Sequence, residues 1–202
     1  MIRQEYFRKL EYKKLLFEYV VLCLCEWGKE LGYQQIPDLS KLRLQKILFF
    51  VCAWNTTAEN AGLLNVFNNF AALPYGPVEL DIYESMCGNT PFKHIKFEGN
   101  NCKVESLSQE CFIDLCQTHK DIVDAAIKQF KDSKYNYITR PVFELVEITH
   151  KWTVWQVAMS FAEMEKMMYK IEGEDLYLIG TSEHSMIGKF IDTILPESDL
   201  PQ

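Results

Sequence analysis

The sequence contains few of the residues and motifs from which enzymes are built. Its 202 residues include only four histidines, at His94, His119, His150 and His184. It has no Gly-x-Ser-x-Gly nucleophile motif, no Gly-rich phosphate-binding loop and no His-Glu-x-x-His zinc motif. These absences argue against the common hydrolases, nucleotide-binding enzymes and zinc peptidases. They favour a protein that acts by binding.

A long apolar run is also missing. Glu18 interrupts the apolar stretch over 15–25, and this stretch is shorter than the roughly 18 residues that a membrane span needs. Glu26 and Trp27 follow it, where a signal-peptide cleavage site needs small residues. The seven cysteines are odd in number, and several have apolar neighbours. We therefore expect a soluble protein of a reducing compartment, the cytoplasm, with a core helix at 15–25.

The chain has no strongly basic region. Its net charge is −7, and residues 161–202 hold nine acidic against three basic residues. Residues 1–46 carry nine basic and six acidic residues, a weak footprint for a protein that must neutralise phosphates. We expect no nucleic-acid or membrane partner. The acidic segment is interpreted as a solvated surface, with a docking tail against a basic partner as the alternative.

Apolar residues at spacings of three and four predict a helix over 15–31, preceded by a separate exposed helix in the first dozen residues. Ser40 is placed to cap a helix over 41–57. Because every residue from Ile47 to Trp54 is apolar, we expect this helix at the centre of the fold. Further helices are predicted over 78–86, 111–130, 142–149 (capped by Thr139), 152–170 and 185–194.

Alternating residues on either side of a turn at 98–101 predict a β-hairpin over Phe92–Leu107. Short strands are expected at 70–73 and 176–179. Pro74 to Pro77 must turn, and Pro77 is placed as the first residue of the next helix. The predicted fold is mainly α (α+β), with six to eight helices around a central apolar helix and one small antiparallel β-hairpin. The predicted domain covers 15–161, with an extension at 1–14 and an acidic one at 162–202.

Two groups of side chains offer chemistry. Cys116 and His119 are three residues apart and share a helix face, but Cys111 lies about 140° around that helix and a zinc site needs a fourth ligand. Helix packing is therefore favoured over metal binding, and no metal or cofactor is expected. His150 with Glu147 could form a general base and its orienting group. A structural role at a helix end is favoured, because the sequence offers no convincing nucleophile or cleft.

Three passages carry a family resemblance. They are Leu42–Phe50 (Leu-Arg-Leu-Gln-Lys-Ile-Leu-Phe-Phe), Phe70–Val78 (Phe-Ala-Ala-Leu-Pro-Tyr-Gly-Pro-Val) followed by Tyr83, and Leu145–Lys151 (Leu-Val-Glu-Ile-Thr-His-Lys) followed by Trp155. In their order and spacing they resemble the Panacea family of SocA-like antitoxins. Leu73 stands where the family usually has Trp, and residues 152–154 depart from its Glu-Gly-Pro.

The resemblance implies an antitoxin that binds a cognate toxin protein, encoded beside it, and blocks it directly. Alternatives are an adaptor that delivers the toxin to a protease, as in one branch of the family, or a small hydrolase using His150. Homo-oligomerisation is left open. The candidate partner-binding residues are Tyr75, Gly76, Pro77, Val78, Tyr83, Thr149, His150, Lys151 and Trp155, and the candidate structural residues are Gln45, Lys46 and Pro74.

Two of these candidates have more than one interpretation. The turn around Tyr75 could be a rigid connection that guides the next helix into the core, or a preformed surface for a partner. Lys46 could be a solvated charge, or it could reach a buried acid such as Asp81 or Glu79, because a polar group within so apolar a helix is costly unless it is satisfied.

Overall fold

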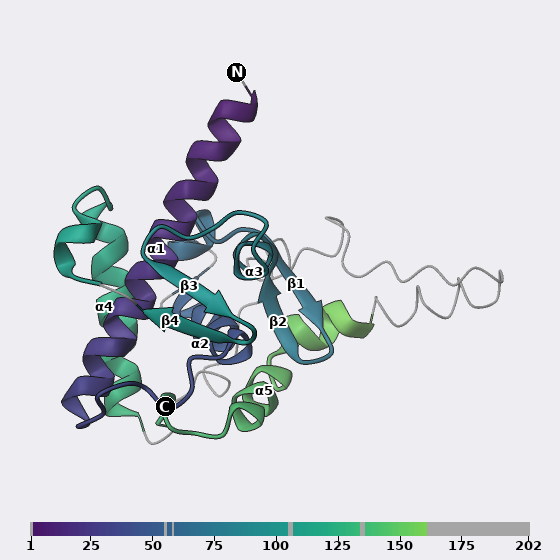
Figure 1. Cartoon of the computed structure of the whole chain (residues 1–202). Helices are drawn as coiled ribbons and strands as arrows, with labels where there is room; N and C mark the ends of the chain where they lie inside the picture. Colours follow the sequence, from purple (N-terminus) through teal and green to yellow (C-terminus); the bar gives the residue numbers. More distant parts are fainter. Residues whose placement is uncertain (1, 55, 58, 105–106, 134–135, 161–202) are drawn as a thin grey trace.

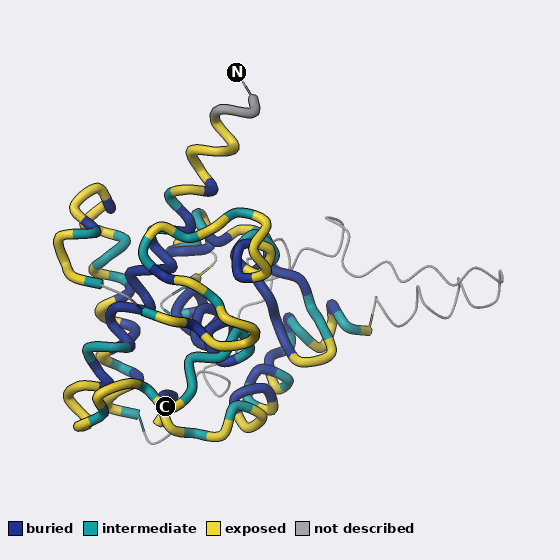
Figure 2. Tube along the Cα trace, in the orientation of Figure 1, coloured by how far each residue is buried: buried dark blue, intermediate teal, exposed yellow. Residues whose placement is uncertain are grey.

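Helix α2 (Lys41–Ala53) forms the centre of the structure, as its apolar sequence predicts. All its residues from Arg43 to Ala53 are buried, and the other elements surround it (Figures 1 and 2). Ser40 caps it as predicted, its hydroxyl accepting a hydrogen bond from Arg43 N. The helix ends at Ala53, before the predicted end at 57, because Trp54 has an extended backbone (φ −58°, ψ 126°).

The computed structural model describes residues 2–54, 56–57, 59–104, 107–133 and 136–160. The strand predicted at 176–179, the helix predicted at 185–194 and the acidic extension lie outside these residues. In the described part, six helices and two pairs of short strands confirm a mainly α fold with a small β part. Besides α2, the elements are α1 (Ile2–Glu30), η1 (Gly62–Asn65), β1 (Phe70–Leu73), β2 (Gly76–Glu79), α3 (Leu80–Met86), β3 (Ile95–Glu98), β4 (Asn101–Val104), η2 (Gln109–Phe112), α4 (Gln117–Asp132), α5 (Val142–His150) and a helical stretch over 153–160.

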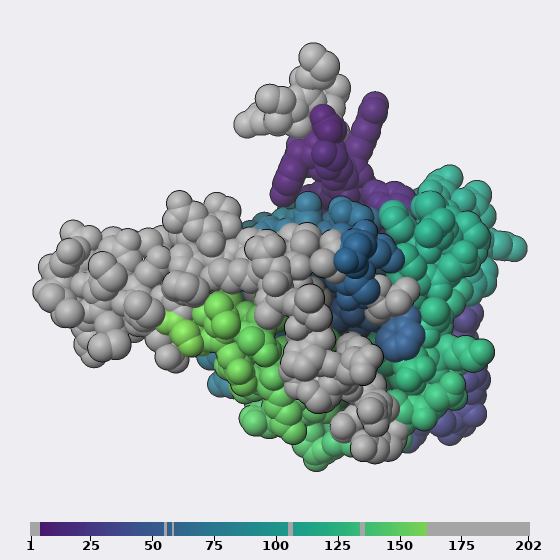
Figure 3. All heavy atoms as spheres, turned by 180° about the vertical axis from the view of Figure 1, so that it is seen from behind, coloured from purple at the N-terminus to yellow at the C-terminus, as the bar shows by residue number. Residues whose placement is uncertain are grey.

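Helix α1 is one continuous helix, so the prediction of a separate helix in the first dozen residues is wrong. No glycine or proline interrupts the chain before Gly28, and Glu5 pairs with Lys9 one turn on, at 2.9 Å. Its 29 residues span about 43 Å at the rise of an α-helix. The middle of α1 is buried, whereas its N-terminal end projects from the rest of the molecule (Figures 1 and 3).

The predicted hairpin is confirmed, with β3 pairing antiparallel to β4. Its outer edge is covered by the buried carboxylate of Glu18, whose Oε1 accepts hydrogen bonds from His94 N at 2.6 Å and Ile95 N at 3.2 Å. Burial raises the pKa of Glu18 despite these bonds. A glutamate that seemed only to interrupt an apolar helix therefore satisfies the backbone of a strand.

A second strand pair was only half predicted. β1 lies where expected, but it pairs with β2, in the segment that the sequence placed in a turn and the start of a helix. The helix begins at Leu80, after Glu79, whose carboxylate caps it by accepting a hydrogen bond from Ile82 N at 2.9 Å. Gln45 on α2 holds Glu79 in extended conformation, since its side-chain amide accepts from Glu79 N and donates to Glu79 O.

Three other helices begin at residues that differ from the predicted ones. The helix predicted from Cys111 is divided into η2 and α4, because Cys116 is non-helical (φ −58°, ψ 128°). Pro141, not Thr139, precedes α5, and Thr139 N instead bonds to Asn136 O in the turn before it. The last described helix begins one residue later than predicted, after Trp152. None of the helices in the described part is long and apolar enough to span a membrane.

Aromatic side chains fill the space between α2 and the segments that follow α4. The ring centroid of Phe49 lies 5.1 Å from that of Trp152, and that of Phe50 lies 5.3 Å from that of Tyr137. All four side chains are buried. Such edge-to-face contacts add to the hydrophobic stabilisation.

We predict that Phe49→Ala lowers the free energy of unfolding by about 3–5 kcal/mol, because it opens a cavity in a closed aromatic cluster. Phe143→Ala is the control, since Phe143 is 63% exposed and its loss should cost roughly 0.5 kcal/mol or less. Urea unfolding followed by circular dichroism measures both. Equal losses for the two variants would contradict the assignment of Phe49 to the core.

Candidate protein-binding site

The three passages that carry the family resemblance meet around the side chain of Lys46. Lys46 comes from α2, Gly76 and Pro77 from the start of β2, and Thr149 from the last turn of α5. A Cβ atom added to Gly76 would overlap Thr149 Oγ1 and lie 3.0 Å from Lys46 Nζ. Residues from three separate parts of the sequence therefore form one buried cluster.

Lys46 is fully buried, and its Nζ donates a hydrogen bond to Pro77 O at 2.7 Å. Burial lowers the pKa of Lys46 to about 7. Neither expectation for this side chain holds: it is not solvated, and no ion pair joins it to a carboxylate within the described residues. Its role is to bind the backbone of the turn.

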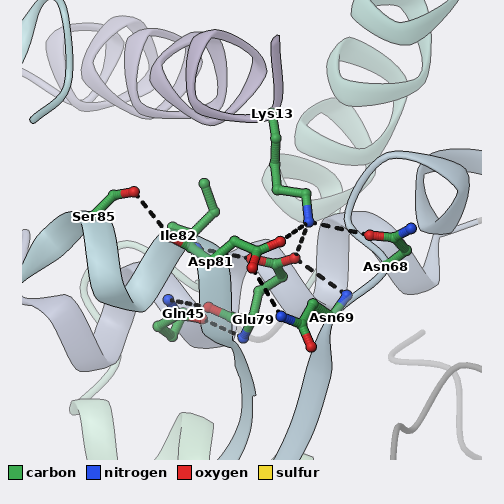
Figure 4. Close-up of polar contacts among 8 residues, drawn as sticks. All are labelled: Lys13, Gln45, Asn68, Asn69, Glu79, Asp81, Ile82 and Ser85. Carbon is green, nitrogen blue, oxygen red and sulfur yellow. Dashed lines mark hydrogen bonds and ion pairs between the residues drawn. The ribbon is translucent and has the colours of Figure 1, made fainter. Parts of the chain in front are cut away.

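The acids expected near Lys46 are bound instead by Lys13 of α1 (Figure 4). Lys13 Nζ lies 2.6 Å from Glu79 Oε1 and 2.5 Å from Asp81 Oδ2, and it also donates to Asn68 Oδ1 at 3.2 Å. Burial acts to lower the pKa of Lys13, but the two carboxylates outweigh it and raise the pKa. The one sign of this ion pair in the sequence is a lysine within an otherwise apolar helix face.

Burial also raises the pKa of Glu79, against the attraction of Lys13. The raised pKa of Lys13 favours its charged form, whereas the raised pKa of Glu79 favours its neutral form. Because two carboxylates face one ammonium, Lys13 stays charged and a carboxyl takes up the proton as the pH falls. Asn69 Nδ2 also stabilises Asp81, because it donates a hydrogen bond to Asp81 Oδ1 at 2.8 Å.

Gly76 is the residue that makes the turn fit. Its φ of +90° lies where residues with side chains are strained, and a Cβ would overlap the cluster. Tyr75 immediately precedes it and is turned out to solvent, 63% exposed. The conformation that buries Gly76 against Lys46 therefore also sets the direction of Tyr75.

Trp155 and His150 support the other side of the turn. Trp155 Nε1 donates to Leu73 O at 3.0 Å, and the His150 ring stacks on the indole with centroids 4.0 Å apart and planes 16° from parallel. His150 Nδ1 lies 4.0 Å from Glu147 Oε1. His150 Nε2 is buried with no hydrogen-bond partner in the described part of the chain, and no serine, threonine or cysteine is bonded to the ring there.

An exposed aromatic pair lies on the surface above this cluster. Tyr75 and Phe143 are each 63% exposed, with ring centroids 6.3 Å apart and planes at 66°. The sequence analysis missed Phe143, although an aromatic residue two positions after Pro141, in the first turn of a helix, was a usable signal. Near the pair, Arg140 forms an ion pair with Glu144 at 2.5 Å, so opposite charges balance there.

The candidate residues thus divide into two sets. Pro74, Tyr75 and Lys151 are exposed, whereas Gly76, Pro77, Val78 and Thr149 are buried, as are Gln45 and Lys46. His150 and Trp155 are half-buried. Tyr83 is 41% exposed on α3, which follows the end of β2 opposite to the turn (Figure 1).

The cysteine and histidine cluster considered for metal binding has another arrangement. Cys111 is in η2, whereas Cys116 precedes α4 and His119 lies in its first turn. Tyr12 joins the latter two to α1, its hydroxyl lying 2.7 Å from His119 Nδ1 and accepting from Cys116 N at 3.1 Å. No group of three potential ligands that could hold a metal occurs among the residues the structure describes.

The structure is thus a mainly helical domain with an exposed aromatic pair beside a turn that Lys46 and Trp155 hold. The family model "Antitoxin SocA-like, Panacea domain" matches residues 44–156, which is more than half of the chain and contains the whole Lys46 cluster. The chain belongs to this SocA-like antitoxin family.

Curated proteins show a second similarity. The serine–tRNA ligase of Methanoculleus marisnigri is 55% identical over 40 residues, which are 20% of this chain and 9% of that enzyme. That of Thermococcus onnurineus is 52% identical over 42 residues (21% and 9%), and that of Ignicoccus hospitalis 33% over 107 residues (51% and 22%). The chain thus spans less than a quarter of each of these ligases. No solved structure matches it significantly.

We predict that Lys13→Met lowers the free energy of unfolding by about 3–5 kcal/mol, because it leaves Glu79 buried without a countercharge. The control is Lys131→Met, which removes the partly exposed ion pair with Glu30 and should cost about 1 kcal/mol or less. Urea unfolding at neutral pH measures the difference. Similar losses for both variants would show that the Lys13 network is open to water.

Gly76→Ala and Gly88→Ala form a second matched pair. Both glycines have positive φ, +90° and +95°, but a Cβ at Gly88 meets nothing within 4 Å. Both variants should suffer backbone strain of roughly 1–3 kcal/mol, and Gly76→Ala should lose more because its methyl group overlaps Thr149. The difference between their melting temperatures isolates this steric effect, and a smaller loss for Gly76→Ala would contradict the packing described.

Proposed function

We propose that this protein is an antitoxin that neutralises a toxin protein by binding it directly, with Tyr75 and Phe143 at the centre of the binding surface. The observation that carries the proposal is an exposed, fixed aromatic pair on a member of an antitoxin family. The toxin is proposed to be encoded beside this gene. The seven cysteines are all free thiols, which supports action in the reducing cytoplasm.

The physical basis is preorganisation. Aromatic residues in the middle of an interface contribute most of its binding energy when they lose little freedom on binding. The turn that carries Tyr75 is already held by Lys46 below and by Trp155 at the side. The charges near the pair are balanced, which is the pattern of an apolar interface centre with a polar rim.

The geometry around His150 favours this function over a hydrolase. The ring is stacked on Trp155, and its Nε2 is buried, so it is placed to support the turn and not to activate a water or a nucleophile. A protease adaptor remains the alternative within binding functions. The two differ in the fate of the toxin, which accumulates in a neutralising complex but disappears when it is delivered to a protease.

The similarity to serine–tRNA ligases does not lead us to propose a ligase activity. The shared stretch is about a tenth of the first two enzymes. A net charge of −7 also opposes binding to tRNA phosphates.

We expect that co-expression with the product of the adjacent gene restores growth and that the two proteins co-purify. Tyr75→Ala and Phe143→Ala should each weaken the complex roughly 30-fold or more, the loss typical of a hot-spot residue. Calorimetry on the purified complex measures the affinity, and pulse-chase labelling of the toxin distinguishes a stable complex from delivery to a protease.

Ile113→Ala is the control, because Ile113 is 79% exposed on another part of the molecule, and it should leave the affinity unchanged. Tyr83→Ala tests whether α3 contributes to the same interface, and we expect little effect. Rescue that persists in the Tyr75→Ala, Phe143→Ala double variant would reject this surface, and failure to rescue at all would reject the function.

A further inference from the structure

We infer that Lys46 is the positioning residue of the Tyr75–Phe143 surface, and that loss or gain of its proton changes how firmly the turn presents Tyr75. The inference rests on the proposed function in one respect, that the Tyr75–Phe143 surface binds a toxin. The behaviour of Lys46 itself is a property of this chain alone, and it can be measured without a toxin.

The two members of the aromatic pair stand on the two elements that meet at Lys46. Tyr75 precedes Gly76, which packs against Lys46 Nζ, and Pro77 O accepts the hydrogen bond from it. Phe143 lies in the first turn of the short helix α5, and Thr149 in the last turn of α5 closes the cluster from the other side. A shift of the lysine head group therefore moves the turn relative to α5, and with it one ring relative to the other.

The contact depends on the charge of Lys46. An ammonium group offers three N–H donors, and within the described residues Lys46 forms one hydrogen bond, to Pro77 O. A buried charge with so little compensation is costly. Uptake of a proton should therefore favour movement of Nζ toward water, which opens the turn, whereas the neutral amine can remain in place and still donate to Pro77 O.

Neighbouring charged groups do not supply the missing compensation, because they are engaged elsewhere. Glu79 of β2 and Asp81 of α3 bind Lys13 of α1. On α5, Glu147 faces His150. Arg43 of α2 pairs with Asp38, Glu144 of α5 pairs with Arg140, and Asp124 of α4 accepts from Tyr19.

The sign of the pH effect follows from burial. The pKa of Lys46 is lowered to about 7 in the folded chain, against about 10.4 in an unfolded one. Between these values the unfolded state binds more protons, so the contribution of Lys46 to stability rises with pH from about 7 upward. Below about pH 7 the full cost of the buried charge is present, and the turn is at its weakest.

The first experiment is amide hydrogen exchange of Gly76, Val78 and Glu79 in the full chain without toxin, at about pH 6 and about pH 8.5, corrected for intrinsic exchange rates. Protection of this segment in the wild type should fall roughly tenfold at the lower pH, the change that corresponds to one pKa unit of coupling. Lys46→Met keeps an unbranched stem of similar size without the titrating group, and it should abolish the pH dependence.

His150→Gln is the matched control, since the His150 ring stacks on Trp155, which supports the turn from its other side. It should keep the pH dependence of the wild type. A pH effect that persists in Lys46→Met, that disappears in His150→Gln, or that is absent from the wild type would each overturn the inference.

A second measurement needs no variant and so stands even if Lys46→Met fails to fold. The ¹³Cε chemical shift of Lys46 followed by NMR should titrate near neutral pH, and a midpoint close to the usual lysine value of about 10.4 would overturn the inference. Where the toxin is in hand, its affinity should rise roughly tenfold between the two pH values for wild type but not for Lys46→Met. If the toxin does not bind but Lys46 titrates near neutral pH as expected, the proposed function is rejected and the inference about Lys46 stands.

Discussion

A buried hydrogen bond, from Lys46 Nζ to Pro77 O, joins the central helix to the turn on which the candidate surface stands. Other features of the site are arranged around it. Gly76 must lack a side chain to leave room for the lysine, and Thr149 closes the space from α5. The amino group of Lys46 satisfies a carbonyl that β2 would otherwise leave buried.

The structure uses two buried lysines in different ways. Lys13 is compensated by two carboxylates and remains charged, so it holds α1 to the junction of β2 and α3 as a permanent ion pair. Among the described residues Lys46 has one acceptor, the carbonyl of Pro77, and burial makes its charge easy to lose. Glu79 caps α3 through Ile82 N and contacts Lys13 through its other oxygen. Because Glu79 lies on the same strand as Pro77, which binds Lys46, β2 connects the two buried lysines.

Sequence reasoning was most successful where a local pattern and the tertiary structure favour the same conformation. The cap at Ser40, the buried helix that follows it and the β3–β4 hairpin are of this kind. It failed at Gly76 to Glu79, where proline and acidic residues suggested a helix start but the side chain of Gln45, distant in sequence, pairs with the backbone and keeps it extended. The ion pair between Lys13 and Glu79 was equally invisible, because it joins residues 66 positions apart.

The same distinction explains why the motifs locate the site but do not define its contacts. The motif residues Lys46, Gly76 and Thr149 are buried, so a toxin cannot reach them; they build the turn and fix its direction. Phe143, which shares the exposed surface with Tyr75, lies outside the recognised motifs. A family that keeps the buried cluster can therefore change the exposed residues beside it without disturbing the fold. Positions such as Phe143 would then determine which partner is bound. Lys46 would determine how firmly the turn holds Tyr75 in place.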